Sequence, residues 1–465
     1  MSATASESGR WPDLPLDLER VVTLFKSAGC QQLWVKQLAQ NDDSKRQIYV
    51  STDLLAFNVL PPRKVILAPP VRKGVHSTRK SVKAGDRRLF GLLDFKWLFL
   101  DRSPERARHA KLIYYPQYPE VRLSGFCLGV RSIPTGYFKE KAGEIFTNRL
   151  LFLGVAPGNR TYGFLTVGHT LLTKSHRKKT GKNKKPALIA ISMENPDFDS
   201  KRRLLHSLRQ IYQRGWIRGC RLTAEGLKEN DAPNAIGYTL EAQLGVTSNG
   251  RNAPDFEGFE IKATAARTDG TLLEKAITLM TPEPNLGVYK SKGVVEFLKT
   301  WGYGDRQDPL NRINFGGIYR FGQIHPRTHL KLEIRGYDPS APDRMDPNGC
   351  VALVDSRGKI AAGWSFSKLI EVWSRKHTRA AYVAAEKRGM PREFRYGPRV
   401  TLCEGTDFLK VLRMLASGCL YLDPGIKAEQ WRSSSPTVKK RNQFRAKTSR
   451  LGSLYDRTKE EDLRK

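Results

Sequence analysis

The second half of the chain carries hydrophobic residues in two periods. RLLHSLRQIYQRGWI, SFSKLIEVWSRK and GTDFLKVLRMLASG repeat apolar residues at helical spacing, which predicts three amphipathic helices. HLKLEIRGYD and RAAYVAAEKR predict strands, and CVALVDSRGKIAAGW predicts a hairpin that turns at residues 356–358. Strands alternating with helices predict an α/β fold, with a mixed central sheet flanked by helices.

Capping residues place the ends of two of these helices. In SFSKLIEVWSRK we expect Ser365 or Ser367 to be the N-cap, because a hydroxyl there can accept a hydrogen bond from a free backbone N–H. In GTDFLKVLRMLASG the expected N-cap is Thr406. Gly418 stands just past the end of this helix, where a residue in the left-handed conformation commonly terminates a helix.

The first 200 residues have a different pattern. VVTLFKSAGCQQLWVKQLA predicts a helix, whereas QIYVSTDLLAFNVLP, LIYYPQYPEVRLSGFCLGV and LLFLGVAPGNRTYGFLTVG predict strands separated by Pro and Gly turns. We therefore expect a β-rich α+β accessory region over residues 1–200 and a second domain over residues 201–465. For the accessory region, two functions remain open: DNA contact and a purely structural role.

A basic segment without acids, residues 174–185, precedes a short apolar strand at residues 187–192. We interpret this basic segment as a solvated loop or a phosphate-contacting arm.

The charge of the chain indicates a polyanionic partner. Lys and Arg number 80 against 46 acids, a formal net charge of +34 in 465 residues. Basic residues that neutralise phosphates release condensed counterions, so such an excess suits nucleic acid. The alternative is a basic surface that serves only solubility.

Cysteine usage and the termini indicate a cytoplasmic protein. The six cysteines lie no closer than 16 residues apart, so no CxxC zinc or redox motif and no disulfide framework is present. The N-terminal MSATASESGRWPDL has no apolar core of a signal peptide, and no apolar run is long enough to cross a membrane.

The segment PDFEGFEIK carries the candidate chemistry. Glu257-Gly258 is a plausible two-residue turn, which would pair Phe256 with Phe259 and bring Asp255 across from Glu260. Period-2 alternation puts Lys262 on the face of Glu260 and turns Phe259 towards the core.

Two carboxylates held this close favour a cation, and their hard oxygens suit Mg²⁺. Such an ion polarises a phosphate and lowers the pKa of a water, and an ammonium beside it can orient that water or stabilise the developing charge. The alternative is a solvated hairpin with ordinary surface charges, because D-x4-E-x-K also arises by chance.

The surrounding segments resemble the MvaI/BcnI family of restriction endonucleases, which belongs to the MutH-like branch of the PD-(D/E)XK nucleases. The similarity runs from about residue 203 to 456 and comprises RQIYQRGWI, IGYTLE, NAPDFEGFEIK, WSFSKLIEVWSRKH, CEGTDFLKVL, YLDPGIK and KKRNQFRAK in family order.

The resemblance implies a PD-(D/E)XK fold and assigns roles. Asp255 and Glu260 correspond to metal-binding carboxylates and Lys262 to the catalytic lysine. Glu241 corresponds to a helix-borne glutamate that completes the metal site or holds a metal-bound water, the alternative being an exposed helix carboxylate. The resemblance also implies Mg²⁺, with Mn²⁺ able to substitute, a monomer, and cleavage of duplex DNA at a short CC-(one base)-GG site. The extra N-terminal region departs from the minimal family nuclease.

Base recognition is expected from the C-terminal segments. Arg and Lys bind guanine edges in the major groove, and acids accept from cytosine. Seven basic residues and no acid lie between Arg432 and Arg450. We nominate five residues for DNA contact: Asp423, Lys427, Arg441, Arg445 and His377. The alternatives are a non-specific phosphate-binding tail and, for His377, a structural histidine.

Three functions remain open on the sequence. The first is a type II restriction endonuclease, whose host would need a cognate DNA methyltransferase for the same site. The second is a MutH-like repair enzyme that nicks one strand. The third is a DNA-binding protein with an inactive nuclease fold.

Overall fold

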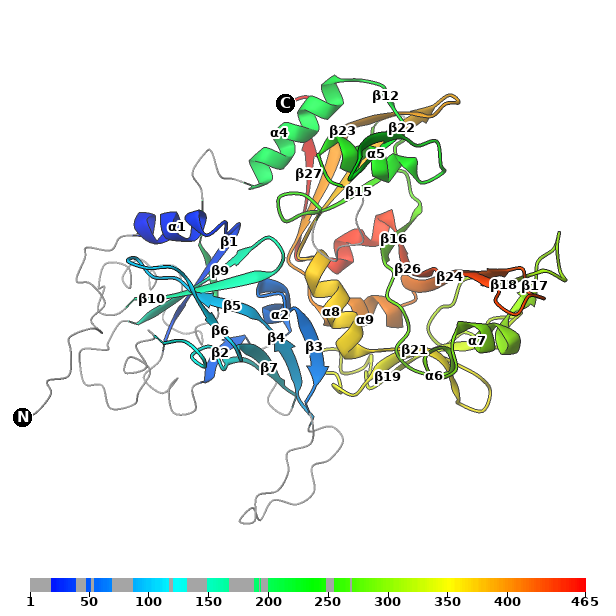
Figure 1. The fold of residues 1–465 in the computed structure, drawn as a ribbon, viewed down its shortest axis with the longest axis horizontal. Coiled ribbons are helices and arrows are strands. Elements are labelled where there is room, and N and C mark those ends of the chain that lie inside the picture. Colours follow the sequence, from blue (N-terminus) through cyan, green and yellow to red (C-terminus); the bar gives the residue numbers. More distant parts are fainter. Residues whose placement is uncertain are drawn as a thin grey trace, which may run out of the picture.

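Figure 1 shows the chain as a computed structural model. It describes residues 18–38, 47–51, 54–68, 87–116, 120–131, 149–166, 188–191, 193, 200–247, 255–267 and 270–465. The basic segment predicted at residues 174–185 lies outside the described residues.

The N-terminal module, which we define as the described residues 18–193, is built mainly of strands. One sheet has the order β11-β1-β9-β10-β5-β6 and the other β2-β8-β7-β4-β3. The first consists of β11 (Ile189–Ile191), β1 (Gln32–Gln37), β9 (Leu150–Ala156), β10 (Arg160–Thr166), β5 (Asp94–Trp97) and β6 (Glu105–Ala107). The second consists of β2 (Gln47–Ser51), β8 (Glu120–Ser124), β7 (Lys111–Tyr115), β4 (Leu89–Leu92) and β3 (Lys64–Leu67), and the helices are α1 (Leu18–Ser27) and α2 (Leu55–Val59).

Two N-terminal predictions were wrong in part. The predicted helix over residues 21–39 ends at Ser27, and Gly29, with a φ of 76°, turns the chain into β1. The predicted strand over residues 47–61 ends at Ser51 and continues as α2. In both cases one apolar segment contains a helix and a strand, because short apolar runs do not distinguish the two.

A mixed sheet forms the centre of the second half. Its order is β12-β23-β22-β15, with β27 also on β23; β15 and β22 are parallel, whereas β22 and β23 are antiparallel. Helices α4 and α5 pack on it through a core that includes Leu208, Leu240, Phe259 and Val383. The elements are α4 (Ser200–Gln213), β12 (Ile217–Arg218), α5 (Ala235–Gln243), β15 (Glu260–Ala265), β22 (Arg379–Arg388), β23 (Glu393–Glu404) and β27 (Arg457–Asp462), with a separate hairpin β13 (Cys220–Thr223) and β14 (Gly226–Glu229). The predicted mixed sheet flanked by helices is confirmed.

A second, six-stranded sheet follows, in the order β16-β26-β24-β18-β17 with β25 on β24. It comprises β16 (Ala276–Met280), β17 (Tyr303–Gly304), β18 (Arg312–Gly316), β24 (Leu420–Glu429), β25 (Thr437–Lys439) and β26 (Asn442–Lys447). The remaining elements are α6 (Val288–Ser291), α7 (Val294–Trp301), β19 (Lys331–Arg335), β20 (Cys350–Val354), β21 (Ile360–Ser365), α8 (Phe366–Lys376), α9 (Phe408–Ala416) and the 3₁₀ helix η4 (Thr448–Leu454). The predicted hairpin β20–β21 is present.

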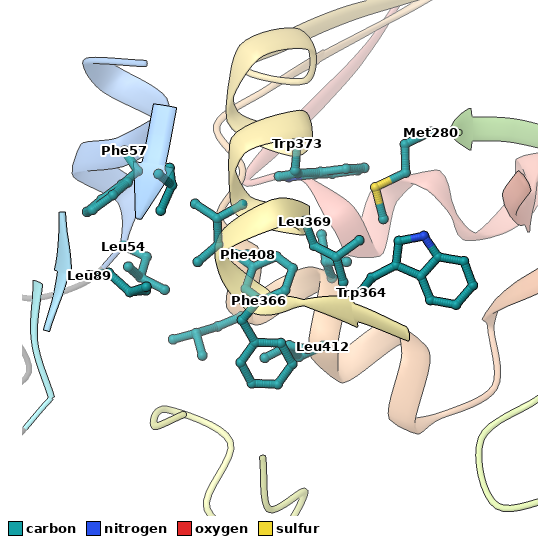
Figure 2. Packing of buried hydrophobic residues seen from close by; sticks show 14 of the residues in the cluster. Leu54, Phe57, Leu89, Met280, Trp364, Phe366, Leu369, Trp373, Phe408 and Leu412 are labelled. Atoms are coloured by element: carbon teal, nitrogen blue, oxygen red, sulfur yellow. The ribbon is translucent and has the colours of Figure 1, made fainter. Parts of the chain in front are cut away.

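Helix α8 is buried on two sides. Figure 2 shows Leu54, Phe57 and Leu89 of the N-terminal module on one side of it and Met280 and Trp364 on the other, and α9 also packs against it. These side chains belong to one hydrophobic cluster that runs through both halves of the chain. The chain passes between the halves near residue 200, where we predicted a boundary, but the two halves do not pack independently.

A serine caps α8 and an aspartate caps α9. Ser365 caps α8 by accepting the backbone N–H of Lys368, one of the two predicted alternatives. For α9 the cap is Asp407, which accepts the N–H of Lys410 at 2.8 Å. The prediction of Thr406 was wrong because that residue is fully buried, where its hydroxyl accepts the indole N–H of Trp373.

All six cysteines are free thiols, and four of them are buried. Among the helices that the structure describes, none combines the length and the hydropathy needed to span a membrane.

Candidate active site

The predicted turn is present at Glu257-Gly258. Both residues have positive φ, 51° and 76°, as in a type I′ turn. Phe256 and Phe259 pair across it through two backbone hydrogen bonds of 3.1 and 2.8 Å. Phe259 is fully buried and anchors the turn to the core beneath the central sheet.

Asp255 is held at the mouth of this turn. Its Oδ2 accepts the backbone N–H of Ile261 at 2.9 Å. The aspartate carboxylate therefore lies beside the first residues of β15, as expected. It is bound to a backbone amide there, and Asp255 and Glu260 do not form a cross-strand β-bridge. Burial and the neighbouring Glu260 raise the pKa of Asp255 to about 6.

Glu260 and Lys262 share one face of β15, as period-2 alternation predicted. Lys262 Nζ donates to Glu260 Oε1 at 2.8 Å, and the glutamate side chain is only 4% exposed. Burial raises the pKa of Glu260, but the ammonium groups of Lys262 and Lys376 outweigh it and hold this pKa below its usual value. The pair is thus an ionised carboxylate held by ammonium.

Lys376 is a member of this group that the sequence analysis did not nominate. Its Nζ lies 3.7 Å from Glu260 Oε2, an atom that accepts no hydrogen bond within the described residues. Lys376 ends α8, and β22, which begins three residues later, pairs in parallel with β15, Ala380 opposite Glu260. The basic run at the end of this predicted helix was visible, but the strand pairing that brings it to Glu260 was not.

Glu241 approaches the same group from α5, which packs against β15. Burial, Asp255 and Glu260 raise its pKa to about 7. Three carboxylates and two ammonium groups therefore act on one another electrostatically here: Glu241, Asp255, Glu260, Lys262 and Lys376.

The donor chemistry of the site fits a hard divalent cation. Two carboxylates have raised pKa values because they are buried and, in addition, because like charges crowd them, and Glu260 retains a buried oxygen without a hydrogen-bond donor in the described part of the chain. Within the described part of the chain, however, no three Asp, Glu, His or Cys side chains converge closely enough to hold a metal ion. Lys262 donates to Oε1 of Glu260, so Oε2 is the oxygen of this carboxylate that is left without a hydrogen bond in the described structure.

Two arginines clamp the turn from outside. Arg203 of α4 forms a two-bond ion pair with the carboxylate of Glu257. Arg379 donates to the carbonyl of Glu257 at 3.0 Å and to Ser200 at 2.8 Å, and it lies over the ring of Phe259. The two arginines therefore tie the turn beside Asp255 and Glu260 to α4 and β22.

The prediction that His377 contacts DNA was wrong. Its side chain is fully buried and stacks on Trp373. Its ring nitrogens contact Tyr455 Oη at 3.3 Å and the carbonyl of Leu279 at 2.9 Å. Burial lowers its pKa to about 4, so the ring is a neutral structural group.

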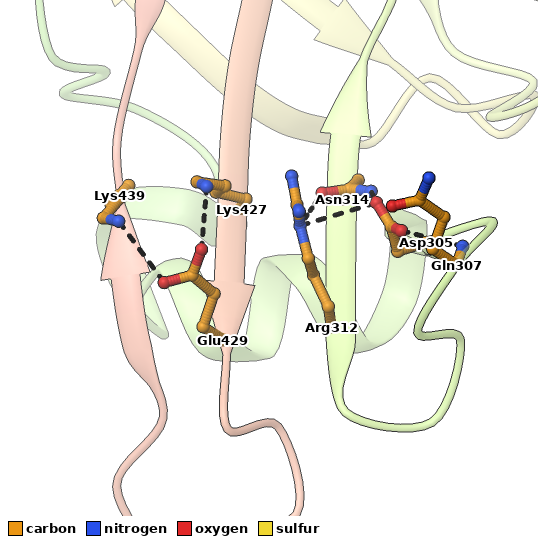
Figure 3. Close-up of polar contacts among 7 residues, drawn as sticks. All are labelled: Asp305, Gln307, Arg312, Asn314, Lys427, Glu429 and Lys439. Carbon is orange, nitrogen blue, oxygen red and sulfur yellow. Dashed lines mark hydrogen bonds and ion pairs between the residues drawn. The ribbon is translucent and has the colours of Figure 1, made fainter.

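The other four nominated DNA contacts lie on β24 and β26 or directly beside them. Asp423 and Arg445 form an ion pair of 2.6 Å, and Arg445 also donates to the carbonyl of Ala276. In Figure 3 Lys427 donates to Glu429 at 2.7 Å, and Lys439 reaches the same carboxylate. Arg441 is exposed between β25 and β26. The structure thus brings these residues onto one sheet, and whether they bind bases stays a prediction.

The same face of this sheet continues onto β18. Asn314 stands opposite Lys427 and Arg312 opposite Glu429 in the strand register. Figure 3 shows Arg312 and Asn314 directed to Asp305, with Asn314 donating at 2.7 Å. Most of the polar side chains labelled in Figure 3 form hydrogen bonds and ion pairs with one another on this face of the sheet.

The comparisons with known proteins concern the second half of the chain. The model of the MvaI/BcnI restriction endonuclease family matches residues 205–455. Two solved structures are similar: a complex of the restriction endonuclease MvaI with its cognate DNA substrate (16% identity, TM-score 0.41) and MvaI without DNA (17% identity, TM-score 0.33). Each similarity covers 56% of this chain and 97% of the other. No curated protein sequence matches.

Proposed function

The chain belongs to the MvaI/BcnI restriction endonuclease family, and we propose that it cuts duplex DNA at a short G·C-rich pseudopalindrome of the CC-N-GG type with Mg²⁺ as its cofactor. The family makes it a type II restriction endonuclease acting on DNA. The observation that supports the rest is the group around Glu260, in which Asp255, Glu241 and Lys262 act on one another electrostatically inside the matched region.

The donor types support a metal-assisted hydrolysis. Asp255 and Glu260 would hold the ion, with Glu241 completing the site or binding one of its waters. A bound Mg²⁺ would supply a Lewis acid for the phosphate and a water of lowered pKa. Mn²⁺ has similar ligand preferences, so we expect it to substitute.

The chain's own groups then have separate tasks. Asp255 is fixed by the amide of Ile261, which orients its free oxygen. Lys262 donates to Glu260 in the absence of substrate, and its ammonium is placed to donate to the attacking water or to the charge that develops on the phosphate. Glu260 Oε2, which is buried and accepts no hydrogen bond within the described residues, would be the oxygen offered to the ion, in exchange for its 3.7 Å contact with Lys376 Nζ.

We further propose that the protein acts as a monomer in the cytoplasm, beside a DNA methyltransferase that protects the same site in its host. The free thiols agree with a reducing compartment. A restriction enzyme that meets host DNA requires such protection.

Digestion of a sequenced DNA library tests this function. We expect double-strand ends at one short site with Mg²⁺ or Mn²⁺ and none with a chelator. Persistent nicked circles without linear product would assign strand nicking in its place. Tight binding without cleavage over a broad DNA panel would identify a non-catalytic protein.

A further inference from the structure

The N-terminal module reaches the catalytic turn directly. A Cβ added at Gly258 would lie 2.8 Å from Gln31 Oε1, so the side chain of Gln31 rests on the turn that carries Asp255. The family match begins only at residue 205, and therefore this contact lies outside anything the match describes.

The module is held in place by hydrogen bonds as well as by the shared core. Thr378 donates to the carbonyl of Asn58 at 3.0 Å, and the Asn58 amide donates to the carbonyl of Thr406. Arg375 donates to the carbonyl of Pro62. These contacts join α2 and the segment after it to the C-terminal end of α8, to the residue before β22 and to the residue before the N-cap of α9, so the module is part of the wall around the site.

Between the module and the turn lies a cavity of about 160 Å³. Its N-terminal side comprises Gln31, Gln32, Asn58, Pro61 and residues 155–159, and its other side comprises Asp255, Glu257, Gly258, Arg375 and Thr378. Asp255 therefore belongs both to the proposed metal site and to this cavity.

The size and lining of the cavity restrict its occupant. A cavity of about 150 Å³ accommodates one benzene-sized group, whereas small-molecule and cofactor sites usually exceed about 300 Å³. The side chains that line it offer amides, a hydroxyl, one guanidinium and two carboxylates, without an aromatic ring to stack on a base. Of the carboxylates, Glu257 is neutralised by Arg203, and Asp255 belongs to the proposed metal site. Amides, hydroxyls and Arg are typical contacts to sugar and phosphate, which position a duplex without reading its sequence.

We propose that this cavity binds the sugar–phosphate backbone of the strand being cut, within two nucleotides of the scissile phosphate. The inference rests on the proposed function, because Asp255 sets the place of that phosphate. The N-terminal module is then a substrate-binding wall of the active site, and the turn at Pro157–Asn159 between β9 and β10 lies against the DNA.

A tethered cleavage reagent tests this placement. An iron chelate attached to Pro157→Cys generates hydroxyl radicals beside the exposed turn. Pro104→Cys is the matched control, since Pro104 is also an exposed proline of the module. It precedes β6, two strands from β10 and at the opposite end of β5, where Glu105 pairs with Trp97. Both variants are made with Cys127→Ser, Cys419→Ser and Lys262→Ala, which remove the two partly exposed thiols and the enzyme's own cleavage.

The probe is a duplex oligonucleotide that carries the mapped site. We expect the chelate at position 157 to cut one strand within two nucleotides of the scissile phosphate and the chelate at 104 to give no localised cuts. Absence of such cuts at 157, or the same pattern from both positions, would overturn the proposal. Failure of the proposed function is separate, because the unmodified protein would then not cleave this duplex with Mg²⁺.

Gln32→Ala provides a second measurement. Because an amide contact carries no charge, we expect roughly three- to tenfold weaker binding to the same duplex with an unchanged salt slope. Unaltered affinity would contradict a contact between Gln32 and the backbone.

Discussion

Lys376 Nζ lies 3.7 Å from the one carboxylate oxygen of Glu260 that accepts no hydrogen bond within the described residues. Strand β15 thus has a second cation beside it besides Lys262, supplied by the end of α8. The two ammonium groups hold opposite oxygens of one buried carboxylate, and their roles can be separated.

Lys262→Ala and Lys376→Met should reduce cleavage to different extents. We expect the first to lower kcat at least about 100-fold, as for loss of one donor to a developing charge. The second should lower kcat about tenfold, because its contact with Glu260 is longer. Single-turnover cleavage measures both, with DNA binding as the control for folding. Full activity of the Lys262 variant would remove this lysine from the mechanism.

Metal binding should depend on Glu260. Mg²⁺ at about 100 times its dissociation constant would stabilise the native protein by about 2.7 kcal/mol, and we expect Glu260→Gln to lose this increment. Thermal unfolding with and without Mg²⁺ measures it in the absence of DNA. Glu333→Gln, at a partly exposed ion pair away from the site, is the control that should respond like the native protein. An equal response of Glu260→Gln would place the metal elsewhere.

Glu241→Gln should stabilise the metal-free protein at high pH. Burial beside Asp255 and Glu260 raises the pKa of Glu241 from 4.5 to about 7. The folded state therefore binds this proton more tightly than the unfolded state, and stability falls as pH rises from about 4.5 through 7.

Since glutamine cannot ionise, we expect a gain of about 1–2 kcal/mol at pH 8 and little gain at pH 4.5, measured by urea unfolding. Glu225→Gln is the control, because hydrogen bonds from Lys228 and Thr223 lower its pKa. A loss of stability in Glu241→Gln at pH 8 would refute the expected charge crowding.

Removing the clamp on the catalytic turn should affect both stability and rate. Arg203→Ala breaks a two-bond ion pair with Glu257, and we expect a loss of about 1 kcal/mol together with a severalfold lower kcat. Arg203→Lys should recover part of the rate. Arg102→Ala, at an exposed pair with Asp101, should change neither quantity. An unchanged rate in Arg203→Ala would show that the turn holds its position without the clamp.

The two arginines nominated for base contact should behave differently. Arg441 is exposed, so Arg441→Ala should relax specificity at one base pair, at a cost of about 1–3 kcal/mol. Arg445 is bonded to Asp423 and to the carbonyl of Ala276, so Arg445→Ala should also lower the melting temperature. Cleavage profiles over a randomised site measure specificity. A uniform loss of affinity in Arg441→Ala, with a shallower salt slope, would reassign this residue to phosphate.

Local chemistry made much of the turn at Glu257-Gly258 predictable. Glu-Gly between two short apolar-polar segments specifies a turn with positive φ, and alternation then fixes which side chains share a face. The burial of Phe259 and the contact between Glu260 and Lys262 follow from those two rules.

Contacts between distant segments were not predictable in this way. Lys376 reaches Glu260 because β15 and β22 pair in parallel, and His377 is buried because α8 packs on two sides. No local period encodes either arrangement. The break between α1 and β1 was missed because the apolar run continues across Gly29, whose left-handed conformation ends the helix.

The two-sided burial of α8 has a consequence for how the protein is made. Asn58 and its partner Thr406 are 348 residues apart, so the N-terminal module leaves the ribosome long before the helices that cover its apolar flank exist. At roughly 5–20 residues per second, that flank waits on the order of 20–70 seconds for its partner. During this interval a nascent chain exposes a hydrophobic surface around Phe57, and chaperones bind surfaces of this kind.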